Sequence, residues 1–332
     1  MCRYLLLLFI IAPSAWASNV TAANTGDSGS GSLRAALSIA GSGDTIVFDA
    51  SLANQTITLA STLTITTNLT IDGAGSPGLV ISGNNAVGVF TVYGADATFR
   101  HLTIANGNGI FSGTNGGGIN SNNSAIVTVD SCTLRNNTAA SGGAILDDGV
   151  SMTVVNSTFS GNSASQSVGG AIDSTSNLTV ENSSFVNNSA VAGGVIYCHN
   201  IGTAEVVADS LFAGNSNNGG TINGGVISDV SHLLQGDHNL YWNNSASGGD
   251  CLSCASDTSP VTANPLLGSL ANNGGPTQTY LPGAGSAAVA GLPAASFPPC
   301  LATDQRGHAR GLGSYCEIGS VDSEEIFAYG FE

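Results

Sequence analysis

A phrase of one hydrophobic residue, two spacers and an asparagine recurs four times in the middle of the chain. Its copies are Leu134/Asn137, Phe159/Asn162, Phe185/Asn188 and Phe212/Asn215, and the asparagines are 25, 26 and 27 residues apart. A second phrase, Gly-Gly-x-Ile, ends at Ile145, Ile172, Ile196 and Ile227, with a shortened copy at residues 117–119. A repeat of this length, sustained over several copies, is typical of a solenoid in which each copy stacks on its neighbours.

The residues between these phrases predict β-strands. Short runs such as MTVV at 152–155 and LTVE at 178–181 place β-branched or aliphatic residues at alternate positions, and Gly, Asn and Asp separate the runs. A leucine-rich repeat has a similar period, but it needs leucines at fixed offsets and a helical return segment. Each period here holds about three short strands and nothing helix-like, so we predict an all-β fold, a parallel β-helix.

In a β-helix, equivalent positions of successive coils stack about 4.8 Å apart. We therefore expect the four repeat isoleucines to form one inward ladder, and Leu134, Phe159, Phe185 and Phe212 to form another. The repeat asparagines should bond amide to amide along the tube, which is a structural role. Glycine pairs, and asparagine as the best non-glycine substitute, suit turns with positive φ.

Both ends of a solenoid need protection, because exposed strand edges promote aggregation. Leu33, Ala36, Leu37 and Ala40 fall on one helical face after Ser32, so we predict a short N-terminal capping helix with Ser32 as its N-cap. Prolines and four of the cysteines concentrate beyond residue 250, which indicates an irregular C-terminal cap. The expected divisions are a signal peptide (1–17), an N-terminal cap (18–43), β-helix repeats (44–250), a C-terminal cap or anchor-like module (251–318) and an acidic tail (319–332).

The first residues predict export from the cytoplasm. Arg3, an apolar run over residues 5–11 and the triplet Ala15-Trp16-Ala17 form the pattern of a secretory signal peptide. The alternative, an uncleaved anchor, is weaker because the run falls well short of the ~20 residues that span a bilayer. No later stretch is long enough either, so we expect no transmembrane segment.

The charge balance limits the partners. The chain has 22 acidic residues against 6 arginines and no lysine, for a net charge of -16. The electrostatic attraction that dominates nucleic-acid affinity is therefore missing, and we expect no nucleic-acid partner.

Without the signal peptide six cysteines remain, an even number that suits an oxidising compartment. Cys132 and Cys198 occupy different repeat positions about two coils apart, so we expect buried thiols there. The expected disulfides, which would staple the C-terminal cap, are Cys251–Cys254 and Cys300–Cys316.

The best cluster for chemistry is a set of acids that follow the repeat isoleucines, namely Asp147, Asp148, Asp173 and Asp229, with His199 at a nearby repeat position. Aligning the repeats brings these acids toward one side of the tube. Carboxylates about 5 to 9.5 Å apart are what a glycoside hydrolase needs, and carboxylate oxygens also suit a weak extracellular calcium site. Asp147, Asp148 and Asp173 are thus the catalytic candidates, and all four aspartates are candidate calcium ligands. A merely solvated acidic face is the alternative.

Two longer stretches carry a family resemblance. GSLRAALSIAGSGDTIVFDASLANQTITL, followed by LTIDGAG, LTIANG and the Gly-Gly-x-Ile phrases, resembles the N-terminal and repeat regions of bacterial pectin-lyase-like right-handed β-helix proteins of the polymorphic outer-membrane type. NPLLGSLANNGGPTQTYLPGAGSAAV with TDQRGHARGLGSYCEIGS is similar to the C-terminal module of surface proteins with a choice of anchor. The resemblance implies a secreted or surface-displayed protein associated with the bacterial outer membrane.

The resemblance leaves two function classes open. The first is a non-enzymatic structural, adhesive or carbohydrate-binding module, whose partner would be a polysaccharide or a cell surface. The second is a carbohydrate-active enzyme, because pectin-lyase-like helices host polysaccharide lyases and hydrolases. The Gly-His-Gly and Arg-x-Lys phrases of polygalacturonase-like proteins do not occur in the sequence. We therefore favour the non-enzyme, with no cofactor other than possible calcium.

Overall fold

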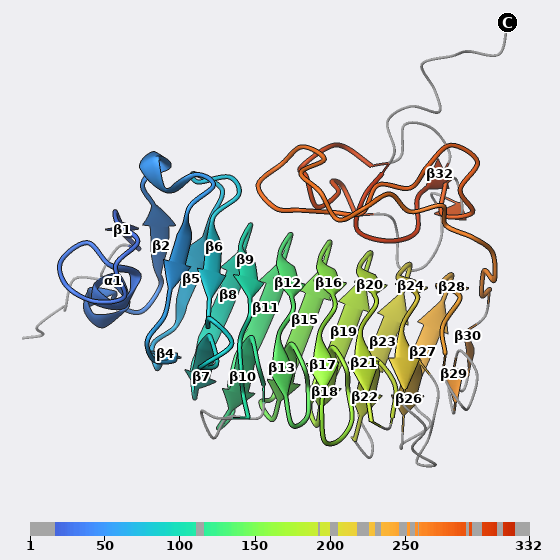
Figure 1. Cartoon of the computed structure of the whole chain (residues 1–332), viewed down its shortest axis with the longest axis horizontal. Helices are drawn as coiled ribbons and strands as arrows, with labels where there is room; N and C mark the ends of the chain where they lie inside the picture. The colour runs from blue at the N-terminus through green and yellow to red at the C-terminus, as the bar shows by residue number, and fades with distance from the viewer. Residues whose placement is uncertain are drawn as a thin grey trace, which may run out of the picture.

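The computed structural model describes residues 17–110, 116–191, 193–199, 205–217, 226–229, 234–245, 251–252, 256–257, 259–289, 292–293, 301–310 and 315–322. Over these residues the chain winds into a parallel β-solenoid of about eight turns, and a loop-rich C-terminal segment returns along one side of it (Figure 1). The predicted all-β parallel solenoid is confirmed.

Each coil passes through three long sheets, which we call sheets A, B and C. Within the described residues, sheet A has ten strands: β1 (Asn19–Ala22), β2 (Asp44–Phe48), β5 (Leu69–Asp72), β8 (Asp96–Arg100), β11 (Ile126–Asp130), β15 (Ser151–Val155), β19 (Asn177–Glu181), β23 (Glu205–Ala208), β27 (Leu234–Asp237) and β30 (Ser256–Asp257). Its neighbouring strands are all parallel, from β1 and β2 at the start of the solenoid to β27 and β30 at its end.

Sheets B and C contain eight strands each among the described residues. Sheet B consists of β3 (Thr56–Thr58), β6 (Val80–Ser82), β9 (Thr103–Ala105), β12 (Thr133–Arg135), β16 (Thr158–Ser160), β20 (Ser184–Val186), β24 (Leu211–Ala213) and β28 (Leu240–Trp242). Sheet C consists of β4 (Leu63–Ile65), β7 (Phe90–Tyr93), β10 (Ile119–Asn122), β14 (Ile145–Asp147), β18 (Ile172–Ser174), β22 (Ile196–Cys198), β26 (Ile227–Asp229) and β29 (Cys251–Leu252).

A fourth and narrower sheet lies between sheets B and C in the middle coils. Its strands are β13 (Thr138–Ala139), β17 (Ser163–Ala164), β21 (Ser189–Ala190) and β25 (Ser216–Asn217). Solenoid pairing extends outside residues 44–250, because β1 pairs with β2 and both β29 and β30 pair with the preceding coil.

The core of the tube consists of the ladders that the repeats predicted. The isoleucines pair in register from Ile145 through Ile172 and Ile196 to Ile227, and each is fully buried. The aromatic ladder stacks face to face, with centroid distances of 4.7 Å between Phe159 and Phe185 and 4.9 Å between Phe185 and Phe212. Alternation along each strand sends these side chains inward and their neighbours outward, which gives one continuous apolar core.

The asparagine ladder is also confirmed. The side-chain amide of Asn162 donates to Oδ1 of Asn188 at 2.9 Å, and that of Asn188 donates to Oδ1 of Asn215 at 3.1 Å. The second amide hydrogen of Asn188 bonds the carbonyl of Phe159, so the buried amide is fully used. The positive φ angles belong to other residues of the turns, such as Asn187 and the first glycines of three pairs, Gly142, Gly169 and Gly193.

Two short helical segments occur in the described residues. The α-helix α1 (Leu33–Ile39) begins at Ser32, whose hydroxyl accepts a hydrogen bond from the backbone N–H of Ala35, as the sequence predicted. It lies beside β1 at the N-terminal end of the solenoid (Figure 1). The other is the 3-10 turn η1 (Ala50–Leu52).

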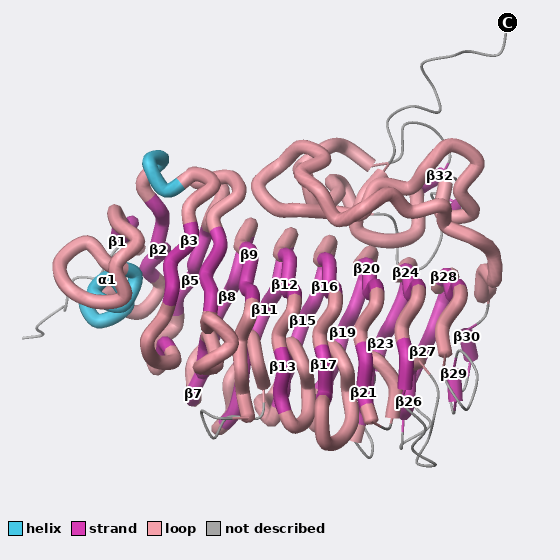
Figure 2. The backbone as a smooth tube through the Cα atoms, viewed as in Figure 1, coloured by secondary structure: helices cyan, strands magenta, loops and turns pink. Residues whose placement is uncertain are grey.

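The C-terminal module, which we define as the described residues between 259 and 322, packs along the outer face of sheet B. It consists almost wholly of loops, with one antiparallel pair, β31 (Leu292–Pro293) and β32 (Tyr315–Cys316) (Figure 2). A second apolar cluster joins the module to the solenoid: Val186, Leu211 and Leu240 of sheet B pack with Ala288 and Ile318. The outer face of sheet B is therefore partly an interior surface.

The cysteines are described only in part. Cys132 and Cys198 are buried and outside any disulfide, as expected. Cys316 is buried, whereas Cys254 and Cys300 lie outside the described residues. The two disulfide pairings therefore stay predictions.

Candidate functional site

Of the four predicted aspartates, Asp147 lies inside the tube. It follows Ile145 by two positions on β14, so its side chain points inward and is fully buried. Its carboxylate accepts hydrogen bonds from the hydroxyls of Ser121, Ser174 and Ser176 and from the backbone N–H of Gly149. A buried carboxylate that is this fully hydrogen-bonded stabilises the core and is closed to a ligand.

Asp173 lies one register position away and on the other side of the sheet. Its backbone pairs with Leu146, whereas that of Asp147 pairs with Ser174, so the two carboxylates leave the sheet on opposite faces. Asp229 occupies the same register position as Asp147, because successive strands pair Asp147 with Ser174, then with Cys198 and then with Asp229. The structure does not describe the side chain of Asp229. The structure therefore does not bring Asp147 and Asp173 together.

Outside sheet C, a smaller cluster forms around His199. The imidazole Nε2 lies 2.8 Å from Oδ1 of Asp173, and the ring of Tyr197 lies edge-on to it at a centroid distance of 4.5 Å. The hydrogen bond to Asp173 raises the pKa of His199, although partial burial opposes this, and the charge of Asp148 adds to the rise. Asp148 is exposed and accepts a hydrogen bond from Thr175.

This outer cluster is a histidine–carboxylate pair with a second acid nearby. Asp173 is almost completely covered, with 5% of its side chain exposed, whereas 43% of His199 is exposed. Such a pair can hold a proton at the ring nitrogen or accept one. Among the described residues no three His, Cys, Asp or Glu side chains are placed to hold a metal ion together. Calcium binding by the four aspartates stays a prediction that this geometry does not favour.

A different candidate site lies where the C-terminal module meets sheet B. A cleft of about 270 Å³ opens there between Trp242, at the end of β28, and Tyr280 of the module. The Tyr280 hydroxyl is 2.8 Å from the hydroxyl of Ser160, which fixes the ring. Trp242 keeps 39% of its surface exposed, and Asn187 and Asn264 also line the cleft.

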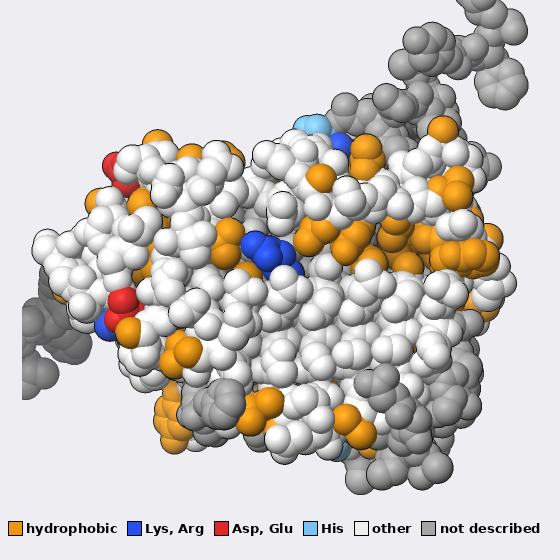
Figure 3. Space-filling view, in the orientation of Figure 1, with side chains coloured by type: hydrophobic (Ala, Val, Ile, Leu, Met, Phe, Trp, Pro, Cys, Tyr) orange, Lys and Arg blue, Asp and Glu red, His pale blue; other side chains and the backbone are white. Residues whose placement is uncertain are grey.

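Figure 3 shows the same seam on the surface, as a band of hydrophobic side chains between the solenoid and the C-terminal module. The combination of two aromatic rings and several amide side chains in an open cleft suits a ligand with both apolar faces and hydroxyl groups. We call this the Trp242 cleft.

Buried polar contacts hold the module over this face of sheet B. The side-chain amide of Gln305 donates to the carbonyl of Cys132 and to the hydroxyls of Thr133 and Thr277 at 2.9 to 3.0 Å, and its oxygen accepts from Thr158. One side-chain amide therefore joins the module to two successive strands of sheet B, β12 and β16.

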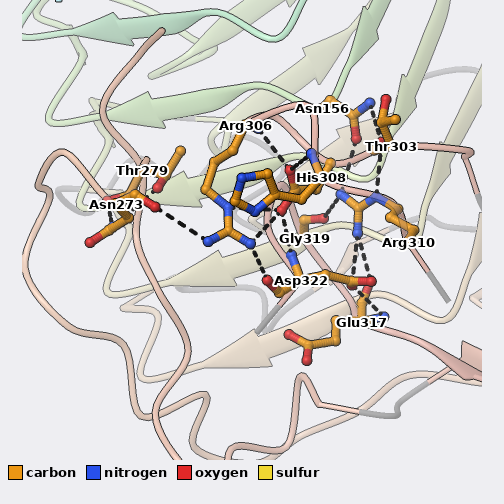
Figure 4. A network of polar contacts seen from close by, with 11 residues as sticks. Asn156, Asn273, Thr279, Thr303, Arg306, His308, Arg310, Glu317, Gly319 and Asp322 are labelled. Atoms are coloured by element: carbon orange, nitrogen blue, oxygen red, sulfur yellow. Dashed lines mark hydrogen bonds and ion pairs between the residues drawn. The ribbon is translucent and has the colours of Figure 1, made fainter. Parts of the chain in front are cut away.

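Two arginines add to these contacts: Arg310 bonds the solenoid, and Arg306 bonds other residues of the module (Figure 4). Arg310 donates to Oδ1 of Asn156 in the solenoid at 3.0 Å and to the carbonyl of Gly319 at 2.8 Å. Arg306 makes a two-point contact with Asp304 at 2.8 and 2.9 Å. The TDQRGHARG segment therefore attaches the module to the solenoid through Gln305 and Arg310.

Comparison with known families identifies the solenoid. The family described as "Right handed beta helix region" matches residues 57–233, which is slightly more than half of the chain. The chain belongs to the right-handed β-helix family. In this β-helix protein the matched region covers the core ladders and the His199 cluster, and the C-terminal module lies beyond it. No curated protein matches the sequence.

The β-helix contains no membrane-crossing helix in its described part: neither helical segment there has the length and apolar character that a bilayer requires.

Sequence reasoning missed Trp242 and Tyr280. Trp242 follows Tyr241, which continues the inward aromatic ladder at 5.5 Å from Phe212. Alternation along the strand therefore places Trp242 outward, and that signal was present in the repeat itself. Tyr280 gave no such signal, because its place depends on how the C-terminal module folds back.

Proposed function

We propose that this β-helix protein is a secreted or surface-displayed, non-catalytic module that binds a carbohydrate in the Trp242 cleft. The observation that carries the proposal is the pairing of an exposed tryptophan with a hydrogen-bonded tyrosine across an open cleft. Aromatic faces pack against the apolar faces of sugar rings, and amide groups such as those of Asn187 and Asn264 can bond sugar hydroxyls.

The rigidity of the cleft supports the proposal. Its floor is the outer face of sheet B, and its other wall is bonded to the solenoid through Tyr280 and Gln305. A site that is formed before the ligand arrives loses little conformational entropy on binding, which favours affinity for flexible chains such as polysaccharides.

The surface location and the caps belong to the same proposal. Residues 1–17 would direct export, and the partner would lie at a cell surface, as for an adhesin; the outer-membrane and choice-of-anchor resemblances support this part of the proposal. The helix α1 would close the first coil, and a Cys300–Cys316 disulfide would staple the C-terminal module. The placement of α1 beside β1 supports the first of these two roles.

The test uses the mature protein on a glycan array, followed by titration of the glycans that bind. The sequence has two tryptophans, and Trp16 lies in the predicted signal peptide, so the fluorescence of the mature protein would report on Trp242 alone. We expect bound glycan to change this fluorescence and Trp242→Ala to lose binding. Tyr93→Ala is the matched control, because Tyr93 is an exposed aromatic residue on sheet C. Equal binding by the two variants would place the carbohydrate elsewhere.

One observation favours a second candidate, a carbohydrate-active enzyme. The Asp173–His199 pair at 2.8 Å has the geometry of a general acid or base held by a buried carboxylate. If it is catalytic, the protein depolymerises a polysaccharide and Asp173→Asn abolishes the activity, while Asp96→Asn, an exposed aspartate on sheet A, retains it. Absence of activity across neutral and acidic polysaccharides would remove this candidate.

A further inference from the structure

Arg135 differs from the other described arginines because it has no acidic partner. Arg34, Arg100, Arg306 and Arg310 each lie within 3.3 Å of an aspartate oxygen. Within the described part of the chain the side chain of Arg135 makes no ion pair or hydrogen bond, and its Nε atom is buried without an acceptor. In a chain with a net charge of -16, an arginine without a carboxylate is a marked exception.

The side chain of Arg135 lines a small pocket between sheet B and the C-terminal module. Arg135 is the last residue of β12 and follows the inward Leu134, so it points to the outer face, toward the module. The pocket has a volume of about 130 Å³, and its other walls include Asn54, Thr103, Thr277 and Gln278. On this face a basic patch is visible in the seam between the solenoid and the module (Figure 3).

Several hydrogen bonds fix the walls of this pocket. The hydroxyl of Thr133 donates to the carbonyl of Gln278 at 2.6 Å, and the hydroxyl of Thr277 donates to the carbonyl of Ser131 at 3.2 Å. On the other side, the backbone N–H of Gly78 donates to the carbonyl of Pro276 at 2.8 Å. The pocket is therefore formed before any ligand enters.

We propose that the Arg135 pocket binds a small oxyanion group, namely a carboxylate, sulfate or phosphate. A guanidinium presents paired donors that match two oxygens of such a group, and the buried Nε of Arg135 has no acceptor within the described part of the chain. The side-chain amides of Asn54 and Gln278 and the hydroxyl of Thr103 provide further polar contacts. The volume suits a single substituent or a free ion of that size. This site is separate from the Trp242 cleft, and the proposal does not depend on carbohydrate binding there.

The experiment measures the binding of acetate, sulfate and phosphate to the full mature protein by calorimetry, at constant ionic strength. We expect at least one anion to bind, and Arg135→Gln to weaken that binding by about tenfold or more, because a charge-assisted hydrogen bond contributes enough for such a change. The preferred anion identifies the chemical source: acetate indicates a carboxylate, whereas sulfate or phosphate indicates an ester group.

Arg100→Gln is the matched control, since it removes the same charge from an exposed arginine that is already paired with Asp130. We expect this variant to bind like the wild type. Arg135→Lys keeps the charge but lacks the paired donors, so it should bind with intermediate affinity, and it serves if Arg135→Gln fails to fold. No binding of any of the three anions to the wild type, or equal loss in the Arg135 and Arg100 variants, overturns the proposal.

Discussion

The asparagine ladder allows a quantitative test at Asn188. Replacing Asn188 with alanine removes the oxygen that accepts two hydrogen bonds from Asn162, one from its backbone N–H at 3.0 Å and one from its side-chain amide at 2.9 Å. Both donors would remain in a fully buried position. An unsatisfied buried donor costs about 1 to 3 kcal/mol, and water that enters the space left by the amide would recover part of this. We expect a loss of about 2 to 4 kcal/mol in the free energy of unfolding.

The assay is equilibrium unfolding in guanidinium chloride, followed by circular dichroism. Asn177→Ala is the control, because Asn177 is exposed at the start of β19, less than one turn before Asn188. Asn244→Ala gives a second comparison. Asn244 accepts the equivalent two bonds from Asn215, but it is only partly buried, so water can replace its oxygen and the loss should be smaller. If Asn188→Ala unfolds at the same denaturant concentration as Asn177→Ala, the hydrogen bonds of the asparagine ladder do not stabilise the fold.

Three further predictions concern the core, pH and the cysteines. Phe185→Ala removes the middle ring of the aromatic stack and should destabilise the protein by about 3 to 5 kcal/mol in the same assay. Burial and the charge of Asp237 raise the pKa of Asp209 to about 7, so folding favours its protonated form and stability should fall as pH rises from about 4 to 7. Asp209→Asn should therefore raise the melting temperature at pH 8 and leave it almost unchanged at pH 4; equal effects at both would contradict this. Peptide mapping without reduction should find Cys300 linked to Cys316, and a link from Cys300 to another cysteine would refute the pairing.

The ladders were predictable from sequence because their contacts recur at the repeat period. A residue such as Phe185 contacts the equivalent residue of the next coil, about 26 positions away. The repeat period in the sequence therefore predicts which residues are in contact. The asparagine stack was predicted for the same reason, and its amide bonds follow from identical side chains at one spacing.

The candidate acidic site was predicted less well, because a shift of one residue along a strand moves a side chain to the other face of the sheet. Asp147 and Asp173 differ by one register position, and on a β-strand that difference reverses the side-chain direction. The same rule identifies the outward residues Arg135 and Trp242, since each directly follows a member of the inward ladder. Composition and repeat alignment alone do not distinguish these two faces.

The docking of the C-terminal module could not be predicted from the repeat. Gln305 contacts residues in and next to the strands of sheet B that are up to 173 positions away, and none of these contacts is periodic. Its partners are ordinary threonines and a backbone carbonyl, which the sequence does not distinguish from the other polar residues of the coils. Both proposed binding sites lie in the seam that this docking creates.

A stack of coils that touch only their neighbours unravels from its ends, one coil after another. In this protein the C-terminal module acts as a brace, because it is bonded to the loop at Gly78 near one end and its Val261 pairs with Leu240 near the other. The inner coils cannot loosen separately while the brace is attached. Under a pulling force the braced coils should therefore yield together in one large step. Since residues 259–322 are synthesised after the coils, the coils reach this rigidity only once that segment has been made and has docked.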